Sequence, residues 1–142
     1  MTAKPFVAPF AAAIFLAANA NLGFALEAIE IVTPARAKEL GLEIRANAAG
    51  PDAVRVELEF EAKGELQNYS RVALEIDEGG KLFSTSTLRE EPGKPGRIIV
   101  GFAADRAALN KFTLKVVTQS SPRSRVGHVL NIHEFVDLAK LR

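Results

Sequence analysis

The sequence contains no cysteine and no tryptophan, and its 142 residues include one tyrosine and one methionine. The lack of cysteine excludes disulfides, thiolate zinc sites, iron–sulfur clusters and cysteine nucleophiles. The one methionine is Met1, so the rest of the chain offers no thioether ligand. Recognition of sugars by aromatic stacking is also disfavoured, because Tyr69 is the only tyrosine and no tryptophan supplements it.

Neither sign of charge is in excess, since 18 Lys and Arg stand against 17 Asp and Glu. A balanced surface exerts no long-range attraction on polyanions, so we expect no nucleic acid as a partner. Apolar residues make up 48% of the chain and charged residues 25%, a mix that is typical of a folded protein. At this length the natural count is one domain with its own core.

The first 25 residues carry a single charge, at Lys4, which precedes an apolar run over residues 6–18 without hydrogen-bonding side chains. Ala18 and Ala20 then place small residues at the two positions that signal peptidase reads. A basic start, an apolar run and an A-x-A site are typical of a secretory signal peptide. We therefore predict a signal peptide over residues 1–20 that is cleaved after Ala20. The mature protein is then secreted or periplasmic and has no stable membrane span.

Two other interpretations of this segment stay open. A membrane anchor over residues 5–26 is long enough to span a bilayer, but Asn19, Asn21 and Gly23 leave its uninterrupted part too short. A buried N-terminal helix is the other interpretation, and Pro9 disfavours it because proline removes a helical hydrogen bond.

Residues 54–62 hold the clearest secondary-structure pattern after the leader. Apolar side chains occupy every second position, and charged side chains occupy most positions between them. Such alternation indicates a strand with one buried face and one wet face. The apolar set is Val54, Val56, Leu58, Phe60 and Ala62, and the charged set is Arg55, Glu57, Glu59 and Glu61.

The other strands are predicted from alternation or from short apolar runs bounded by turn residues. Gly79 and Gly80 supply the positive φ that a tight hairpin turn requires, so the segments beside them are expected to pair. The predicted strands are residues 29–32 at an edge, 42–46, 72–76, 82–87 near an edge, 98–103 as a central strand covered on both faces, 112–117 and 129–132, with a long polar hairpin loop at 119–127.

Short helical segments are expected between some strands. Thr33 and Pro34 are typical of a helix N-cap and first helical residue, and Gly41 is typical of a helix end. Residues 105–110 are predicted as one helical turn that crosses from one sheet to the other.

The C-terminal end admits two interpretations. Asn131 is placed to cap a helix with Glu134 at its third position, or the last strand runs on to Val136. We favour a strand to about His133 that is followed by a short helical tail.

About seven short strands with little amphipathic helix predict an all-β domain over residues 21–142. Its expected form is an antiparallel two-sheet sandwich with minor short helices. The order of hairpin, long loop, central strand, helical crossover, strand and hairpin resembles an immunoglobulin-like or fibronectin-type Greek key. This resemblance lies in the pattern alone, because the chain has no Cys-Trp-Cys signature.

The two histidines do not form a metal-binding pair in this scheme. On one continuous strand, His128 and His133 face opposite sides of the sheet. The run from His133 to Asp137 is close to the zinc motif H-E-x-x-H, but Asp137 replaces the second histidine. We therefore predict no metal site, and we interpret His133 and Glu134 as surface groups.

Three glutamates of one strand face, Glu57, Glu59 and Glu61, recur about every 7 Å, a spacing that also fits glycosidase carboxylates. A wet face paired with lysines and arginines is the favoured interpretation. No G-x-S-x-G motif is present, so the serines are interpreted as turn and edge residues. We predict no catalytic residue and no cofactor. The serines concerned are Ser84, Ser86, Ser120, Ser121 and Ser124.

Loop side chains are the candidate binding contacts. Arg123 and Arg125 belong to the loop at residues 119–127, and two arginines on a hairpin are suited to a carboxylate or phosphate. Lys94 in the loop at residues 89–96 and Tyr69 complete the candidate set.

Taken together, these features predict a small, exported, non-enzymatic β-sandwich that acts by binding or within an envelope or extracellular assembly. Its partner is expected to be a protein whose identity stays open. The expected contact surfaces are the two loops and an unprotected edge strand. The alternative is a carboxylate-based hydrolase or a metal-binding secreted protein that uses the glutamates of residues 57–61 or His133.

The leader prediction is tested by N-terminal sequencing of the exported protein. We expect the mature chain to begin at Asn21, because cleavage follows the A-x-A site. An intact Met1 on exported material would contradict the signal peptide and favour the anchor.

Overall fold

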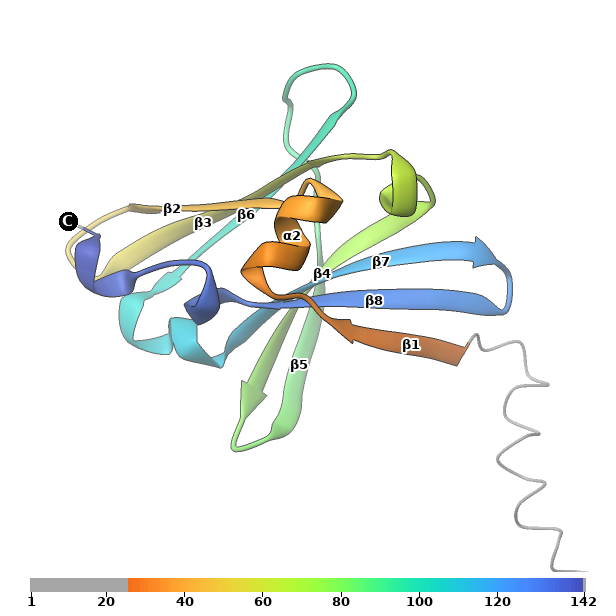
Figure 1. Cartoon of the computed structure of the whole chain (residues 1–142). Helices are drawn as coiled ribbons and strands as arrows, with labels where there is room; N and C mark the ends of the chain where they lie inside the picture. Colours follow the sequence, from red (N-terminus) through yellow and green to blue (C-terminus); the bar gives the residue numbers. More distant parts are fainter. Residues whose placement is uncertain (1–25, 142) are drawn as a thin grey trace, which may run out of the picture.

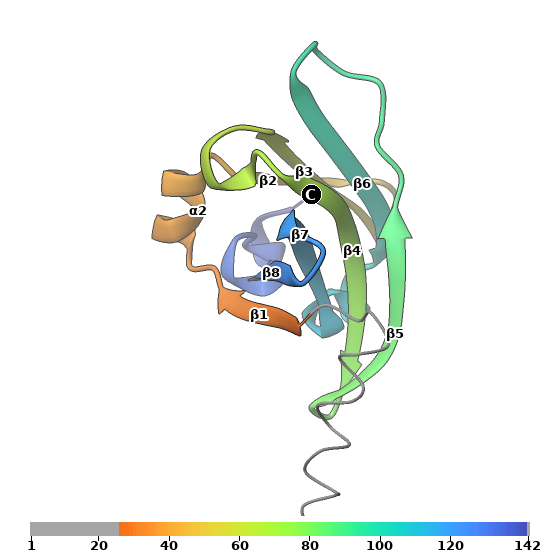
Figure 2. The same cartoon turned by 90° about the vertical axis from the view of Figure 1, so that its right-hand side faces the viewer.

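Two β-sheets face each other in residues 26–141, the part of the chain that the computed structural model describes (Figures 1 and 2). The strand order is β1-β8-β7-β4-β5 in one sheet and β2-β3-β6 in the other. The predicted all-β, two-sheet architecture is thus confirmed, with eight strands in this range rather than about seven. The predicted signal peptide lies outside the described residues. The elements are β1 Leu26–Ile31, α2 Pro34–Leu40, β2 Glu43–Ala48, β3 Ala53–Glu61, η1 Gly64–Leu66, β4 Tyr69–Glu78, β5 Lys81–Leu88, β6 Arg97–Asp105, η2 Arg106–Lys111, β7 Phe112–Ser121, β8 Ser124–Asn131, η3 Ile132–Glu134 and η4 Leu138–Lys140.

β3 confirms the strand predicted at residues 54–62 and lies at the centre of the three-stranded sheet. Its apolar side chains point between the sheets, where Leu58 and Phe60 are fully buried. They share one core cluster with Leu114 and Leu130 of the other sheet. The ring of Phe60 also meets that of Tyr69 edge-on, at 5.2 Å between centroids. The alternation in the sequence therefore marks the side of this strand that faces the core.

β6 is an edge strand, so the prediction of a central strand at residues 98–103 is wrong. Its outer face is partly covered by a loop and not by another layer, since Ile99 is half-buried and Ala103 is exposed. The backbone N–H of Glu91 donates to Ile99, and a Cβ on Gly93 would lie 2.5 Å from Ile99 Cδ1. The apolar side chains on both faces of β6 are therefore explained by the loop at residues 89–96, which folds back onto this strand.

β1 runs parallel to β8, so the expectation of a wholly antiparallel sandwich is wrong at this edge. The two glutamates of β1 point to opposite faces of the sheet because side chains alternate along a strand. On the outer face, Glu27 lies 2.8 Å from Lys115 Nζ, which also meets Glu75 at 2.8 Å. Gly127 makes room for this contact, since a Cβ there would lie 2.8 Å from Lys115 Cδ. Glu30 faces inward.

The two hairpins of the five-stranded sheet differ in how well the sequence predicts them. The β4–β5 turn at Gly79 and Gly80 is confirmed, with φ of 65° and 82°. The prediction of a long polar loop at residues 119–127 is wrong, because β7 extends to Ser121 and β8 begins at Ser124. Backbone hydrogen bonds form these strand ends whatever the polarity of their side chains.

The helix expected after Thr33 is confirmed as α2. Thr33 Oγ1 accepts from the backbone N–H of Arg36 at 3.2 Å, and Gly41 ends the helix at φ 77°. η2 connects β6 with β7, which confirms the predicted crossing between the two sheets. Within residues 26–141, no helix has the length and apolar character that a membrane span requires.

The last strand ends at Asn131, two residues before the favoured end at His133, and the predicted short helical tail follows as η3 and η4. Asn131 precedes η3, but its side chain donates to Glu134 at 3.0 Å instead of capping the backbone. The alternative of a strand to Val136 is therefore wrong.

Leu58→Ala tests the core at its centre. We expect a loss of about 2–5 kcal/mol in the free energy of unfolding, measured with urea, because a fully buried side chain leaves a cavity. Leu82→Ala is the matched control on an exposed position and should change this free energy by less than about 0.5 kcal/mol. Similar losses in both variants would contradict the assigned core.

Candidate functional site

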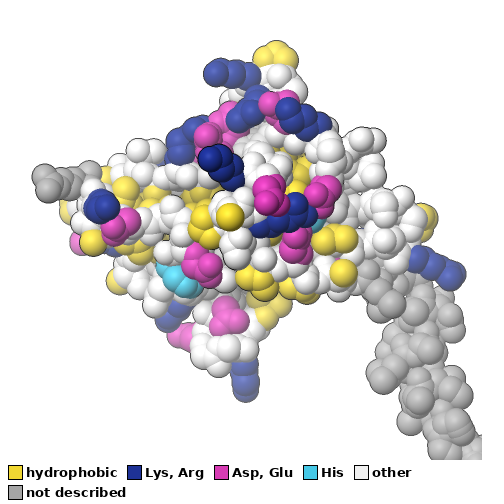
Figure 3. All heavy atoms as spheres, viewed as in Figure 1, with side chains coloured by type: hydrophobic (Ala, Val, Ile, Leu, Met, Phe, Trp, Pro, Cys, Tyr) yellow, Lys and Arg dark blue, Asp and Glu magenta, His cyan; other side chains and the backbone are white. Residues whose placement is uncertain are grey.

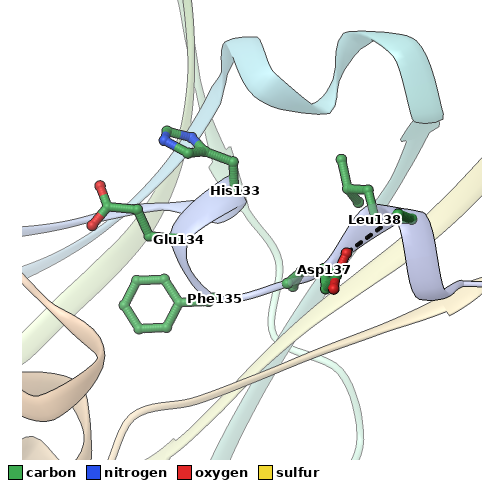
Figure 4. A pocket seen from close by; sticks show the side chains of 7 residues that line it. His133, Glu134, Phe135, Asp137 and Leu138 are labelled. Atoms are coloured by element: carbon green, nitrogen blue, oxygen red, sulfur yellow. Dashed lines mark hydrogen bonds between the residues drawn. The ribbon is translucent and has the colours of Figure 1, made fainter.

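The residues that are close to a zinc motif lie around η3 and η4 and line a shallow pocket of about 570 Å³ (Figure 4). Their polar side chains do not converge in it. Asp137 Oδ1 accepts from the backbone N–H of Ala139 at 3.1 Å, while His133 and Glu134 are exposed and point away from Asp137. Within the described range, no group of three or more His, Asp or Glu side chains is arranged to hold a metal ion.

The glutamates of β3 belong to an ion-pair ladder on the outer face of the three-stranded sheet. Glu59 is 8% exposed, so the prediction of a wet position is wrong there. One of its oxygens accepts from Arg97 Nε at 2.9 Å and the other from Arg45. These hydrogen bonds, that of Arg97 foremost, hold the pKa of Glu59 below its usual range. Lys63 and Arg97 lower the pKa of Glu61 in the same way.

A glycosidase needs one carboxyl group whose pKa is raised, so that it donates a proton at neutral pH. Glu59 and Glu61 have lowered pKa values and stay ionised. Their partners lie on β2, β6 and the chain that follows β3, so the ladder ties the three strands together.

The arginines of the predicted binding loop lie on the β7–β8 hairpin. Arg123 is exposed in the two-residue turn, whereas Arg125 is half-buried and its Nε donates to Gln119 at 3.4 Å. Lys94 is exposed in the loop between β5 and β6, which extends from a different side of the molecule (Figure 1). The structure therefore does not bring Lys94 together with the two arginines.

Tyr69 lies beside the β7–β8 turn but is held by its own contacts. Its hydroxyl donates to Glu90, and its ring packs against Phe60. Burial raises the pKa of the Tyr69 phenol, and the bond to Glu90 adds to that effect. Tyr69 is thus an anchored side chain at the rim of a shallow pocket. That pocket is lined by Gln67, Asn68, Tyr69, Ser70, Gln119, Ser120, Ser121 and Pro122.

His128 is the residue that sequence reasoning missed. It is 3% exposed on the inner face of β8, directly opposite Glu30 in the parallel register with β1. His128 Nδ1 lies 2.5 Å from Glu30 Oε2, and His128 Nε2 lies 3.4 Å from Thr118 Oγ1. In the sequence, the only signal is that Glu30 interrupts the apolar run of residues 29–32. A single polar residue in such a run does not indicate which residue it pairs with.

Arg36 of α2 joins this group from outside the sheet. Its Nε donates to Glu30 Oε1 at 2.8 Å, and its Nη2 donates to Glu65 of η1 at 2.6 Å. The hydrogen bond from Arg36 lowers the pKa of Glu30, desolvation opposes this, and the bond to His128 adds to it. Glu30 is therefore ionised and has both oxygens engaged.

These residues line a pocket of about 410 Å³ between α2, η1 and the ends of β7 and β8. Acidic and basic side chains interleave over α2 on this face of the molecule (Figure 3). The volume is within the range of small-molecule sites. The lining residues are Glu30, Arg36, Glu65, Asn68, Thr118, Ser120, Val126 and His128.

Glu59→Gln tests the role of the ladder. A carboxylate whose pKa is lowered by folding stabilises the protein at neutral pH, and this contribution is lost as the pH falls through the folded-state pKa. We expect Glu59→Gln to unfold at lower urea than wild type at pH 7, with the difference shrinking as the pH drops below 4.5. Asp52→Asn, in an exposed loop, is the control. Equal unfolding midpoints at pH 7 would contradict the structural role of Glu59.

Comparison with known proteins does not assign the chain to a family, because no family model matches it and no similar curated protein or solved structure is found.

Proposed function

We propose that this protein is an exported β-sandwich that acts by binding an extended segment of a partner protein along β5. The predicted leader supports the export. The main observation in support of a binding role is that β5, an edge strand, has two large exposed apolar side chains. Phe83 is 75% exposed and Leu82 is 59% exposed, and both lie on a hairpin that projects from the two sheets (Figures 1 and 2).

The other described sheet edges carry features that prevent strand addition. β1 has Glu27 and Glu30, and β2 has Glu43 and Arg45. β6 is partly covered by residues 90–91, through a bridge to Val100 and a hydrogen bond to Ile99. β5 has no charged side chain from Leu82 to Leu88, and its one irregularity lies at Phe83, close to the hairpin turn.

Residues 82–88 of β5 contain no charge and no proline, and among residues 26–141 β5 pairs with β4 alone. An edge of this kind presents unpaired N–H and C=O groups to a further strand. Strand addition uses these groups for affinity and side-chain contacts for specificity.

Phe83 lies at an irregularity that turns it away from the core. In the β4–β5 register, Ser84 pairs with Ile76 and Leu82 pairs with Asp77, so Phe83 has no partner on β4. Bulged positions re-aim a side chain, and a buried aromatic anchor is typical of binding hot spots. The partner that fits is an extended segment with apolar side chains and a carboxylate near Lys81.

We also propose that the fold is the fibronectin-type Greek key that the sequence pattern resembles. The strand orders β2-β3-β6 and β1-β8-β7-β4-β5, together with the crossing through η2, support this topology. The exposed Arg123 and Lys94 lie on connections outside β5 and are secondary contacts in this proposal.

The binding role is tested with displayed peptides of about twelve residues, selected on the mature protein and measured by titration. We expect selected peptides with alternating apolar residues, at least about tenfold weaker binding to Leu82→Ser plus Phe83→Ser, and amide-exchange protection over residues 82–88. Ile29→Ser plus Ile31→Ser on β1 is the matched control and should bind normally, since both side chains are also exposed.

Three outcomes would overturn this proposal. Equal binding to the β5 variant, or protection at another edge, would contradict the assigned surface. Self-association of the free protein through residues 82–88, seen by light scattering and removed by the β5 variant, would assign the edge to a second copy instead.

A further inference from the structure

Thr118, His128 and Glu30 form a chain of hydrogen bonds across three neighbouring strands. Glu30 is ionised and accepts from His128 Nδ1 at 2.5 Å, so the proton of the neutral imidazole lies on Nδ1. His128 Nε2 is then the acceptor for the Thr118 hydroxyl at 3.4 Å. A hydroxyl, a base and a group that orients the base are the arrangement of an activated nucleophile, and such contacts are often long before substrate binds.

The residues around these three side chains supply the other groups that a nucleophilic site needs. Thr118 and His128 are 7% and 3% exposed, so proton transfer between them is shielded from bulk water. Asn68 and Ser120 line the same pocket and carry N–H and O–H donors of the kind that stabilise an oxyanion. Val126 adds an apolar wall for a small acyl group.

We propose that this pocket is an acyl-transfer site in which Thr118 is the nucleophile, His128 is the general base and a small carboxylic ester is the substrate. Glu30 and Arg36 are positioning residues, because they act on the ester only through the imidazole. This activity is independent of the proposed binding along β5, which lies at the other edge of the five-stranded sheet.

The reaction has two balanced steps. The Thr118 oxygen bonds to the acyl carbon while His128 Nε2 takes the hydroxyl proton and passes it to the departing alkoxide, which leaves as the alcohol. Water then attacks the acyl-threonine with His128 as its base, and the carboxylic acid leaves as the hydroxyl is restored.

The test uses the mature protein with p-nitrophenyl acetate, following nitrophenol release and locating acetyl groups by peptide mass mapping. We expect acetylation at Thr118 in the wild type, and a rate lowered by about 100-fold or more in His128→Gln and Thr118→Val. Thr118→Ser should retain the reaction because it keeps the hydroxyl. Thr113→Val, at a half-buried position further along the same strand β7, is the matched control and should match wild type.

Nitrophenol release no faster than in buffer, or equally fast in Thr118→Val and in the wild type with acetyl groups on lysines only, would overturn the proposal. A His128→Gln rate equal to that of wild type would overturn it as well. Urea unfolding of each variant distinguishes the loss of the nucleophile from the loss of the fold.

Discussion

The parallel pairing of β1 with β8 is the constraint on which the rest of this sheet depends. It sets Glu27 beside Lys115 on the outer face and Glu30 beside His128 on the inner face. Each glutamate brings a charge that costs free energy to bury unless it is paired. A register shift by one residue would exchange the two faces and leave both pairs broken. The pairing and the ion pairs therefore stabilise each other.

The two edge strands of the five-stranded sheet differ in how far other elements cover them. Both proposals are based on this difference. At β1, α2 and η1 pack against the strand ends and border a polar pocket through the contacts of Arg36 with Glu30 and Glu65. At β5 no element of the described residues packs over the hairpin tip, and the Phe83 side chain is 75% exposed. A shielded pocket suits proton transfer, whereas an open edge suits strand addition.

Local signals in the sequence predicted local structure well. The alternation of residues 54–62, the glycines of the β4–β5 turn and the cap of α2 act within a few residues, and all three are confirmed. The central position of residues 98–103 was predicted wrongly, because a returning loop, and not a second layer, half-buries Ile99 on the outer face of this edge strand. The prediction of a loop at residues 119–127 was wrong, because polar side chains do not prevent the backbone hydrogen bonds that pair two strands.

The sequence by itself determined the two-sheet class, most strands, the helical crossing and the absence of thiol chemistry, because periodicity and composition are properties of neighbouring residues. Only the tertiary structure decided which strands pair, and hence that Glu30 meets His128 across 98 positions of the chain. It also decided that Glu59 is enclosed by two arginines. Contacts between distant segments depend on how whole sheets pack, and a local pattern does not encode that arrangement.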